Sequence, residues 1–397
     1  MRKSNHLRLR LTTLLVAAAV AALAAILFCP RSAPSPAYLT DARELAAGRA
    51  ITSDFEKVGY PVLLWAGLSV SGMNGIYAAQ ALLYLGTVVL GATLLRRAGL
   101  RGPRFFWAGA IIVLHPYLLL NITRIVDTNL SACIFLGLVL VLFAGSGKNP
   151  GCAWATAAGL LGGYSWLTRP NYVLILGLFP LLVLRNRNLS LRKRTGLLAV
   201  LGGSGLLLVA GMTAGACGRV RLMTTDGGYT LFTGANPWTG QQLIRNYNTE
   251  GWTPRNLRRL GINPARADLD DVYLDLSLDY IRKNPASYLW FGVLKTVNLF
   301  RPDYRRVDVA APGPRRTVLF LLQTILALPF PVWAAIRIRR GRAIAWRSPL
   351  RPGIIIFLYL APFFFLSTDP RYRLPLDLLL VIDTARTLYL TRAGRQR

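Results

Sequence analysis

Long apolar runs separated by short basic segments constrain this chain more than any other feature. A run of about 17 to 25 mainly apolar residues is long enough to cross a lipid bilayer as a helix. Such runs begin near residues 11, 74, 105, 129, 196, 317, 352 and 374. Because 53% of the 397 residues are hydrophobic and only 16% are charged, an ordinary soluble domain is excluded. We therefore predict a polytopic membrane protein.

Two shorter apolar runs, residues 151–167 and 170–184, predict a hairpin of short spans. Arg169-Pro170 separates them, and the residue before a proline is disfavoured in a helix. Two crossings here also keep the basic cluster 185–194 on the same side of the membrane as the basic cluster 96–104. The predicted fold is therefore all-α, a bundle of about ten transmembrane helices. It lies in the plasma (inner) membrane with both termini cytoplasmic.

The charged residues are sorted to the two sides of this topology. The net charge of +30 would suggest nucleic acid as the partner of a soluble protein, but here the basic residues flank apolar runs, as in cytoplasmic loops. No nucleic-acid partner is therefore expected. Asp and Glu are absent from the predicted cytoplasmic segments, which are residues 1–10, 96–104, 146–150, 185–195, 337–351 and 391–397. Apart from Asp377 and Asp383 in the last span, every acidic residue falls outside, so carboxylate chemistry is expected on the outer face.

The predicted spans divide the chain into three parts. They are an N-terminal transmembrane module (1–216) that carries a first outer loop (30–73), an outer-face loop domain (217–316) and a C-terminal transmembrane module (317–397). The loop domain is too long for a connector and too short for a large core of its own. Within it, residues 268–284 have an amphipathic helical pattern. Pro285 then opens a second, aromatic-rich helix that we expect to lie along the membrane surface.

Two acidic side chains fall where the chain leaves the membrane on the outer side. Asp41 comes soon after the first span, and Asp127 lies in a connection too short to leave the membrane surface. Both are candidate catalytic residues. Each also has a simpler interpretation, since Asp41 could cap a short helix that begins there and Asp127 could pair with Arg124 three residues earlier.

Cationic and phenolic side chains at the same level are candidates for binding a phosphate through charge-assisted hydrogen bonds. Arg371, Tyr372 and Arg373 lie between two prolines at the outer end of the last span, where interfacial anchoring is the alternative role. The remaining candidate substrate-binding residues are Lys57, Tyr60, Arg169, Lys295 and Arg301. The cysteines show no metal-binding spacing, so no metal site is predicted.

Several segments, taken in order along nearly the whole chain, resemble one known family. They are FEKVGYPVLLW at 55–65, LTRPNYVL at 167–174, GGYTLFTGANPWTG at 227–240, YIRKNPASYLWFGVLKTVNLFRPD at 280–303 and RYRLPLDLLLV at 371–381. Together with an early outer-loop aspartate, they are similar to the bacterial family-39-type glycosyltransferases of the GT-C superfamily. That superfamily includes the protein O-mannosyltransferases and the lipid A aminoarabinose transferase.

The resemblance implies an inverting transfer of a sugar from a polyprenyl-phosphate donor to a lipid, glycan or protein acceptor at the outer membrane face. By position, Asp41 matches the family's catalytic carboxylate and Lys57 resembles its donor-phosphate lysine. Two positions depart from the family pattern: Glu44 stands where many members have tyrosine, and Asp127 stands where glutamate is common. Both departures affect the residues that the resemblance would place beside Asp41.

The implied chemistry suits these residue types. A carboxylate can take the proton of an acceptor hydroxyl, and fixed Arg or Lys charges can stabilise the leaving phosphate. A monophosphate donor can react without a bound metal, so no cofactor is expected. The alternatives are an oligosaccharide polymerase or ligase, a lipid or solute transporter with ionisable groups in mid-span, and a non-catalytic scaffold.

Overall fold

The computed structural model describes residues 2–28, 36–51, 58–145, 150–220, 227–239, 257–258, 261–262, 269–300, 328–340, 352–366 and 370–394. Every regular element among these residues is a helix, and they contain no strand. The predicted all-α fold is confirmed in this respect.

Four helices in the described part are long and apolar enough to cross a membrane. They are the segment Arg10–Leu27 of α1 (Arg2–Phe28), α3 (Gly59–Arg97), α6 (Thr128–Gly145) and α10 (Leu191–Cys217). The prediction of about ten such helices is not met. Shorter apolar helices cover other predicted spans: α4 (Gly102–Val113), the run Pro170–Arg185 and α18 (Pro352–Phe365).

Helix breaks and charged residues explain why the structure has fewer long apolar helices than predicted. The run Pro170–Arg185 is divided into η1 (Pro170–Tyr172), α8 (Val173–Leu176) and α9 (Leu178–Arg185). The helix break predicted at Arg169-Pro170 is present, because α7 (Cys152–Thr168) ends just before these residues. The last helix, α19 (Leu374–Gly394), carries Asp377, Asp383 and Arg386. The span predicted from residue 317 begins outside the described residues, and α17 (Pro329–Arg340) follows it.

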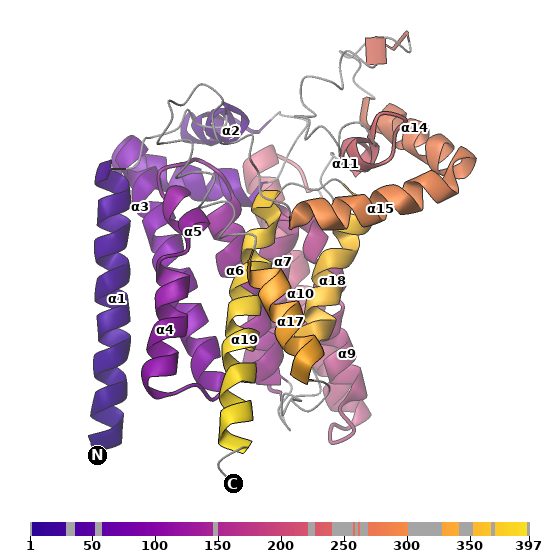
Figure 1. Cartoon of the computed structure of the whole chain (residues 1–397). Helices are drawn as coiled ribbons and strands as arrows, with labels where there is room; N and C mark the ends of the chain where they lie inside the picture. The colour runs from indigo at the N-terminus through magenta and orange to yellow at the C-terminus, as the bar shows by residue number, and fades with distance from the viewer. Residues whose placement is uncertain are drawn as a thin grey trace, which may run out of the picture.

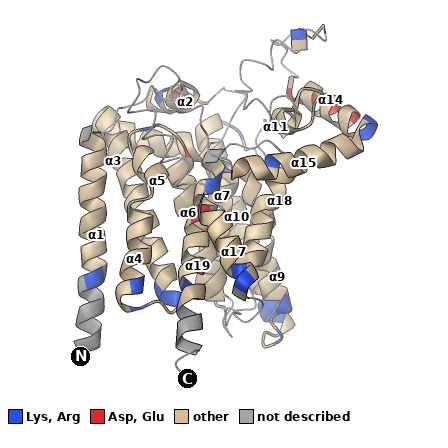
Figure 2. Cartoon of the chain, viewed as in Figure 1, with Lys and Arg blue, Asp and Glu red and all other residues tan. Residues whose placement is uncertain are grey.

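The long helices stand side by side in a bundle with two different ends (Figure 1). One end, named here the cap end, carries α2 (Pro36–Ala46), α11 (Gly227–Gly234), α14 (Leu269–Lys283) and α15 (Pro285–Leu299). Both chain termini lie at the opposite end, named here the terminus end (Figure 1). Lys and Arg gather mainly at the terminus end, whereas Asp and Glu are concentrated on α2 and α14 (Figure 2).

Small residues let α7 and α10 pack backbone against backbone. A Cβ added to Gly159 would lie 2.2 Å from the Leu201 carbonyl oxygen and 2.0 Å from Ser204 Oγ. One helical turn later, a Cβ on Gly163 would lie 2.6 Å from the Gly205 carbonyl oxygen. Two glycines spaced four apart are typical of close helix contacts in membranes. This pair was not among the predicted contacts.

α3 changes direction within its length. Ser71 and Gly72 leave the helical region, and Gly72 has φ 57° and ψ −139°, a conformation that favours glycine. Next to this kink the chain folds closely on itself, because a Cβ on Gly75 would lie 1.9 Å from the Gly67 carbonyl oxygen. The segment before the kink, which contains Tyr60, is therefore a separate helix from the apolar span that follows it.

The two helices predicted in the loop domain are present as α14 and α15. Pro285 occupies the first turn of α15, as predicted. Asn284 stands at the N-cap position, but its side-chain amide donates to the Tyr280 carbonyl oxygen at 3.3 Å and does not cap α15. The division of the chain into three parts stays a prediction.

We expect Gly159→Ala to destabilise the protein by about 1 to 3 kcal/mol, because overpacking a tight contact forces the backbones apart. Thermal unfolding in detergent should show a clearly lower melting temperature. Gly203→Ala, on α10, is the matched control, since a Cβ there meets no atom within 4 Å. Equal melting temperatures for the two variants would contradict the close α7–α10 contact.

Candidate functional site

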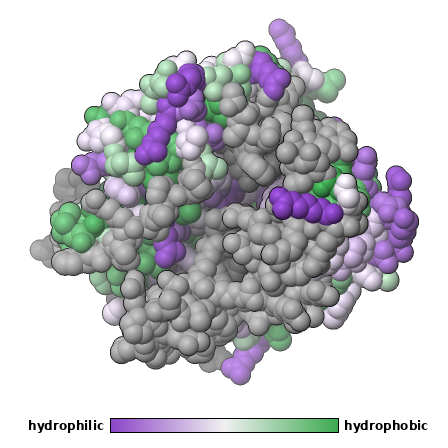
Figure 3. Space-filling model, turned by 90° about the horizontal axis from the view of Figure 1, so that it is seen from above, coloured by the Kyte–Doolittle hydropathy of each residue, from purple (hydrophilic) through white to green (hydrophobic). Residues whose placement is uncertain are grey.

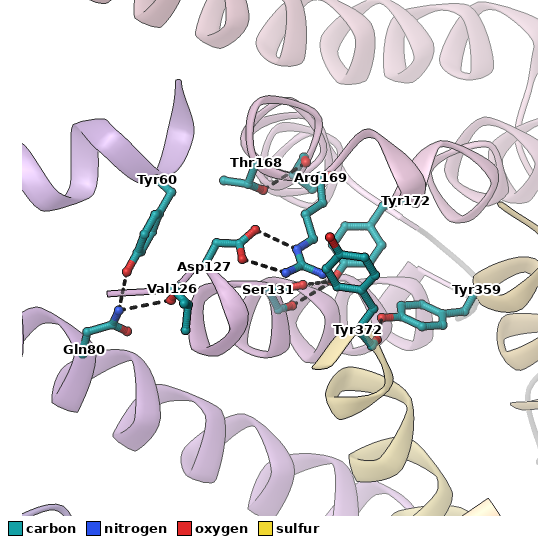
Figure 4. A network of polar contacts seen from close by, with 11 residues as sticks. Tyr60, Gln80, Val126, Asp127, Ser131, Thr168, Arg169, Tyr172, Tyr359 and Tyr372 are labelled. Atoms are coloured by element: carbon teal, nitrogen blue, oxygen red, sulfur yellow. Dashed lines mark hydrogen bonds and ion pairs between the residues drawn. The ribbon is translucent and has the colours of Figure 1, made fainter. Parts of the chain in front are cut away.

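A buried ion pair between Asp127 and Arg169 lies at the centre of the candidate site (Figure 4). Asp127 directly precedes α6, and Arg169 directly follows α7. Arg169 donates from Nε to Asp127 Oδ2 at 2.9 Å and from Nη2 to Oδ1 at 2.7 Å. The two residues are only 4% and 5% exposed. Both carboxylate oxygens of Asp127 thus bind an arginine that lies 42 residues away in the sequence. The predicted pairing with Arg124 does not include this contact.

Aromatic side chains lie beside the arginine of this pair. The Arg169 guanidinium carbon lies 4.4 Å from the centre of the Tyr372 ring, a favourable cation–π contact. The Tyr359 hydroxyl donates to the Tyr372 carbonyl oxygen, and the Tyr172 hydroxyl donates to the Ser131 carbonyl oxygen at 3.0 Å. Figure 4 shows these rings gathered on one side of Arg169. The contact between Arg169 and Tyr372 joins this predicted site residue to the ion pair.

Gln80 fixes the other side of the site. Its Nε2 donates to the Tyr60 hydroxyl at 2.5 Å and to the carbonyl oxygens of Val126 at 3.2 Å and Arg124 at 3.3 Å. Both Gln80 and Tyr60 are completely buried. The amide therefore holds Tyr60 beside the segment that carries Asp127 (Figure 4). Gln80 was not among the predicted site residues, although an amide inside an apolar run was an available signal.

Asp41 lies in the middle of α2, which begins at Pro36. The interpretation of Asp41 as the cap of a helix that starts there is wrong, because proline at the first turn begins the helix earlier. The Asp41 side chain is on the buried face with Leu39 and Ala42. On the same helix, Tyr38 packs edge-on against Tyr60 with ring centres 5.0 Å apart. One aromatic contact therefore connects α2 to the site.

Glu44, which replaces the tyrosine common in the resembled family, is occupied elsewhere. Its carboxylate accepts from Arg49, with 3.0 Å between Oε1 and Nη2. The hydrogen bond from Arg49 lowers the pKa of the Glu44 carboxyl below its usual value. Glu44 is therefore an exposed ion-pair partner on α2.

Lys295 and Arg373, both 1% exposed, join α15 to the rest of the cap end. Lys295 Nζ donates to the carbonyl oxygens of Gly234 at 3.0 Å and Phe365 at 3.1 Å. Burial lowers the pKa of the Lys295 ammonium to about 7. Arg373 Nε donates to Asp377 Oδ2 at 2.8 Å, and its Nη1 donates to the Leu299 carbonyl oxygen at 3.4 Å. Protein atoms therefore bind both cations, and neither is an exposed anchor.

Three other predicted binding side chains lie outside the described part of the structure. Lys57 and Arg301 lie outside the described residues, as does the side chain of Arg371. The remaining predicted residues are buried, except Tyr372, which is partly buried. Arg169 contacts both Asp127 and Tyr372 directly, and Gln80 links Tyr60 to the segment that carries Asp127.

The described residues contain no group of three or more His, Cys, Asp or Glu side chains that could hold a metal ion. The chain does have one Asp-X-Asp triplet, Asp268-Leu269-Asp270. Within it, the Asp270 carboxylate accepts from the backbone N–H groups of Gly228 at 3.0 Å and Tyr229 at 2.8 Å. Asp270 thus caps the start of α11. The expectation that no metal is required stays a prediction.

Seen from the cap end, hydrophilic side chains of the described residues are scattered over the face, and some hydrophilic atoms are visible near its centre (Figure 3). The chain matches no protein-family model, no curated protein and no solved structure. The function must therefore be argued from the residues themselves.

We expect Asp127→Asn to destabilise the protein by about 3 to 5 kcal/mol, because it leaves a buried arginine without its counter-charge. The double variant Asp127→Leu/Arg169→Met should melt closer to the wild type, since it removes both charges. Glu44→Gln, which breaks the exposed Glu44–Arg49 pair, is the control and should leave the melting temperature unchanged. A wild-type melting temperature for Asp127→Asn would mean that the pair does not hold the site together.

Proposed function

We propose that this protein is a membrane glycosyltransferase of the GT-C kind. It moves a sugar from a polyprenyl-phosphate donor to a hydroxyl of a lipid, glycan or protein acceptor at the outer face of the plasma membrane. One observation carries the proposal: a buried carboxylate on α2, Asp41, lies at the same end of the bundle as the Asp127–Arg169 pair. Carboxylates and cations near each other at a membrane surface suit transfer from a lipid phosphate.

The two carboxylates are suited to different roles. A carboxylate held by both nitrogens of an arginine fork is a poor base, because the pairing favours its charged form. Asp127 therefore orients Arg169. Asp41 is then the general base: it takes the proton of the acceptor hydroxyl as that oxygen attacks the anomeric carbon. The bond from this carbon to the phosphate oxygen breaks, and polyprenyl phosphate leaves with the electron pair and inversion at the anomeric carbon.

The cations of the cap end are suited to receive the phosphate. Asp127 takes up Nε and Nη2 of Arg169, which leaves Nη1 outside the pair and able to face a ligand. Lys295 has a pKa lowered by burial to about 7, and an adjacent phosphate would favour its charged form. Arg373 links α15 to the start of α19 and so keeps Tyr372 against Arg169. Lys57, Arg301 and Arg371 remain candidate donor contacts from the resemblance.

The orientation follows from the charges. Lys and Arg gather at the terminus end (Figure 2), and cytoplasmic loops carry an excess of these residues. The termini are then cytoplasmic, and the cap end faces outward. In this proposal the shorter helices α4, α7, Pro170–Arg185, α17, α18 and α19 complete a topology of about ten crossings together with the four long helices.

A transport function has less support from the acid inside the last predicted span. Asp383 Oδ2 accepts from Trp333 Nε1 at 2.8 Å and from Arg337 Nε at 3.0 Å. These bonds connect α17 to α19, so Asp383 has a structural role. An ion-coupled carrier needs an acid that can exchange its proton or ion during the cycle.

We expect Asp41→Asn to abolish transfer while leaving the fold intact. Loss of a general base lowers the rate by about 100- to 10,000-fold. The assay is transfer of a labelled sugar from polyprenyl phosphate by purified protein in lipid nanodiscs, with melting temperatures matched to the wild type. Arg43→Gln, an exposed change two residues away on α2, is the control and should keep wild-type activity.

Two results would count against this proposal. More than about a tenth of wild-type turnover in Asp41→Asn lies outside the range for a lost base and would remove Asp41 from the chemistry. Transfer of preassembled oligosaccharides from a polyprenyl diphosphate, with none from the monophosphate, would instead identify a polymerase or ligase.

A further inference from the structure

α15 has two apolar faces, and the protein covers only one of them. Its buried residues are Tyr288, Gly292, Lys295 and Leu299, whose spacing of three and four places them on one side of the helix. That side packs on α18: a Cβ on Gly292 would lie 2.5 Å from the Phe364 ring, and the Tyr288 hydroxyl donates to the Phe365 carbonyl oxygen at 2.9 Å. The contact fixes α15 firmly.

The second apolar face of α15 is exposed. Leu289, Val293 and Val297 recur every four residues, and Trp290 lies beside them. Trp290 is 58% exposed and Val297 60% exposed. A contiguous row of large apolar side chains on a helix that is already packed on its other side marks an interaction surface. We name Leu289, Trp290, Val293 and Val297 the α15 outer face.

The α15 outer face belongs to the same apolar surface as the side of the bundle. α15 crosses the cap end at a steep angle to α18 and α19 (Figure 1). α18 itself exposes Ile354, Phe357 and Phe365, which share one side at 100° per residue. Phe365 lies at the end of α18 that touches Tyr288, with ring centres 6.5 Å apart. The exposed apolar side chains of α18 therefore lead directly to α15.

We propose that the partner of the α15 outer face is the lipid bilayer, and that α15 lies flat in the outer leaflet. The exposed side of an apolar bundle helix faces acyl chains. A helix that continues this surface across the end of the bundle therefore reaches the boundary between acyl chains and headgroups. Interfacial helices bury their apolar face about 5 to 10 Å into this boundary. Trp290 suits that level, since tryptophan is enriched at membrane interfaces.

The proposal has a structural consequence for the loop domain. α15 is joined to α14 by the Asn284 turn, and Lys295 joins it to α11 through the Gly234 carbonyl oxygen. A lipid-embedded α15 therefore holds α11 and α14 against the membrane surface. This role does not depend on the chemistry that the site performs.

Quenching of tryptophan fluorescence tests the proposal on the full-length protein in nanodiscs. The emission of Trp290 is obtained by subtracting the spectrum of Trp290→Phe from that of the wild type. It is compared in ordinary phosphatidylcholine and in phosphatidylcholine brominated near the glycerol end of one acyl chain. We expect the brominated lipid to remove most of this difference emission, whereas aqueous acrylamide removes little.

Two further subtractions calibrate the result. Trp107, which is 67% exposed on the apolar helix α4, is the lipid-facing control and should be quenched by brominated lipid. Trp238, which packs against the cluster of Phe232, Leu257 and Tyr273, is the control away from lipid and should not. Quenching of Trp290 by acrylamide alone would place the α15 outer face in water, and quenching by neither agent would place it against protein. Either outcome overturns the proposal.

Discussion

The bidentate pair between Asp127 and Arg169 is the interaction on which the rest of the cap end depends. Two charges buried in an apolar bundle are costly unless each satisfies the other with good geometry. The pair meets this requirement with two short hydrogen bonds. It joins the start of α6 to the end of α7, two points 42 residues apart in the sequence. The segments that carry Tyr60, Tyr172 and Tyr372 are arranged around it.

Each neighbour of this pair is held by a different part of the fold. Gln80 ties Tyr60 to the carbonyl oxygens just before Asp127, and the Tyr38 ring attaches α2 to Tyr60. On the other side, Tyr359 holds the backbone of Tyr372. The buried site is thus assembled from helices far apart in the chain, as a site that excludes water requires. Electrostatic interactions are stronger in such surroundings than in water.

Much of the helix pattern could be predicted from the sequence, because local periodicity and proline positions determine it. α14 and α15 follow from the amphipathic run and Pro285, and Arg169-Pro170 correctly marks the end of α7. Local patterns were less reliable where two signals competed. Helix capping was the simpler interpretation of Asp41, but α2 already begins at Pro36. The number of long apolar helices was overestimated because apolar length does not reveal where a helix breaks.

The candidate site was predictable in composition and not in pairing. The selection of Asp127, Arg169, Tyr60 and Tyr372 rested on their expected level in the membrane, and the structure brings these four together. Which of them bond to one another depends on helix packing, which sequence spacing does not encode. The Gly159 and Gly163 spacing on α7 and the Gln80 amide were visible in the sequence, but neither shows which helix it contacts. Both nevertheless help set the position of Arg169 or Asp127.

A cryo-EM structure of the protein with bound polyprenyl phosphate tests the central claim most directly. The account predicts that the lipid phosphate lies at the cap end, within hydrogen-bond distance of Arg169 or Lys295. The space next to the phosphate oxygen that carries the sugar in the donor should face Asp41 on α2. A phosphate bound at the terminus end, or at the cap end without contact to either cation, would contradict the account.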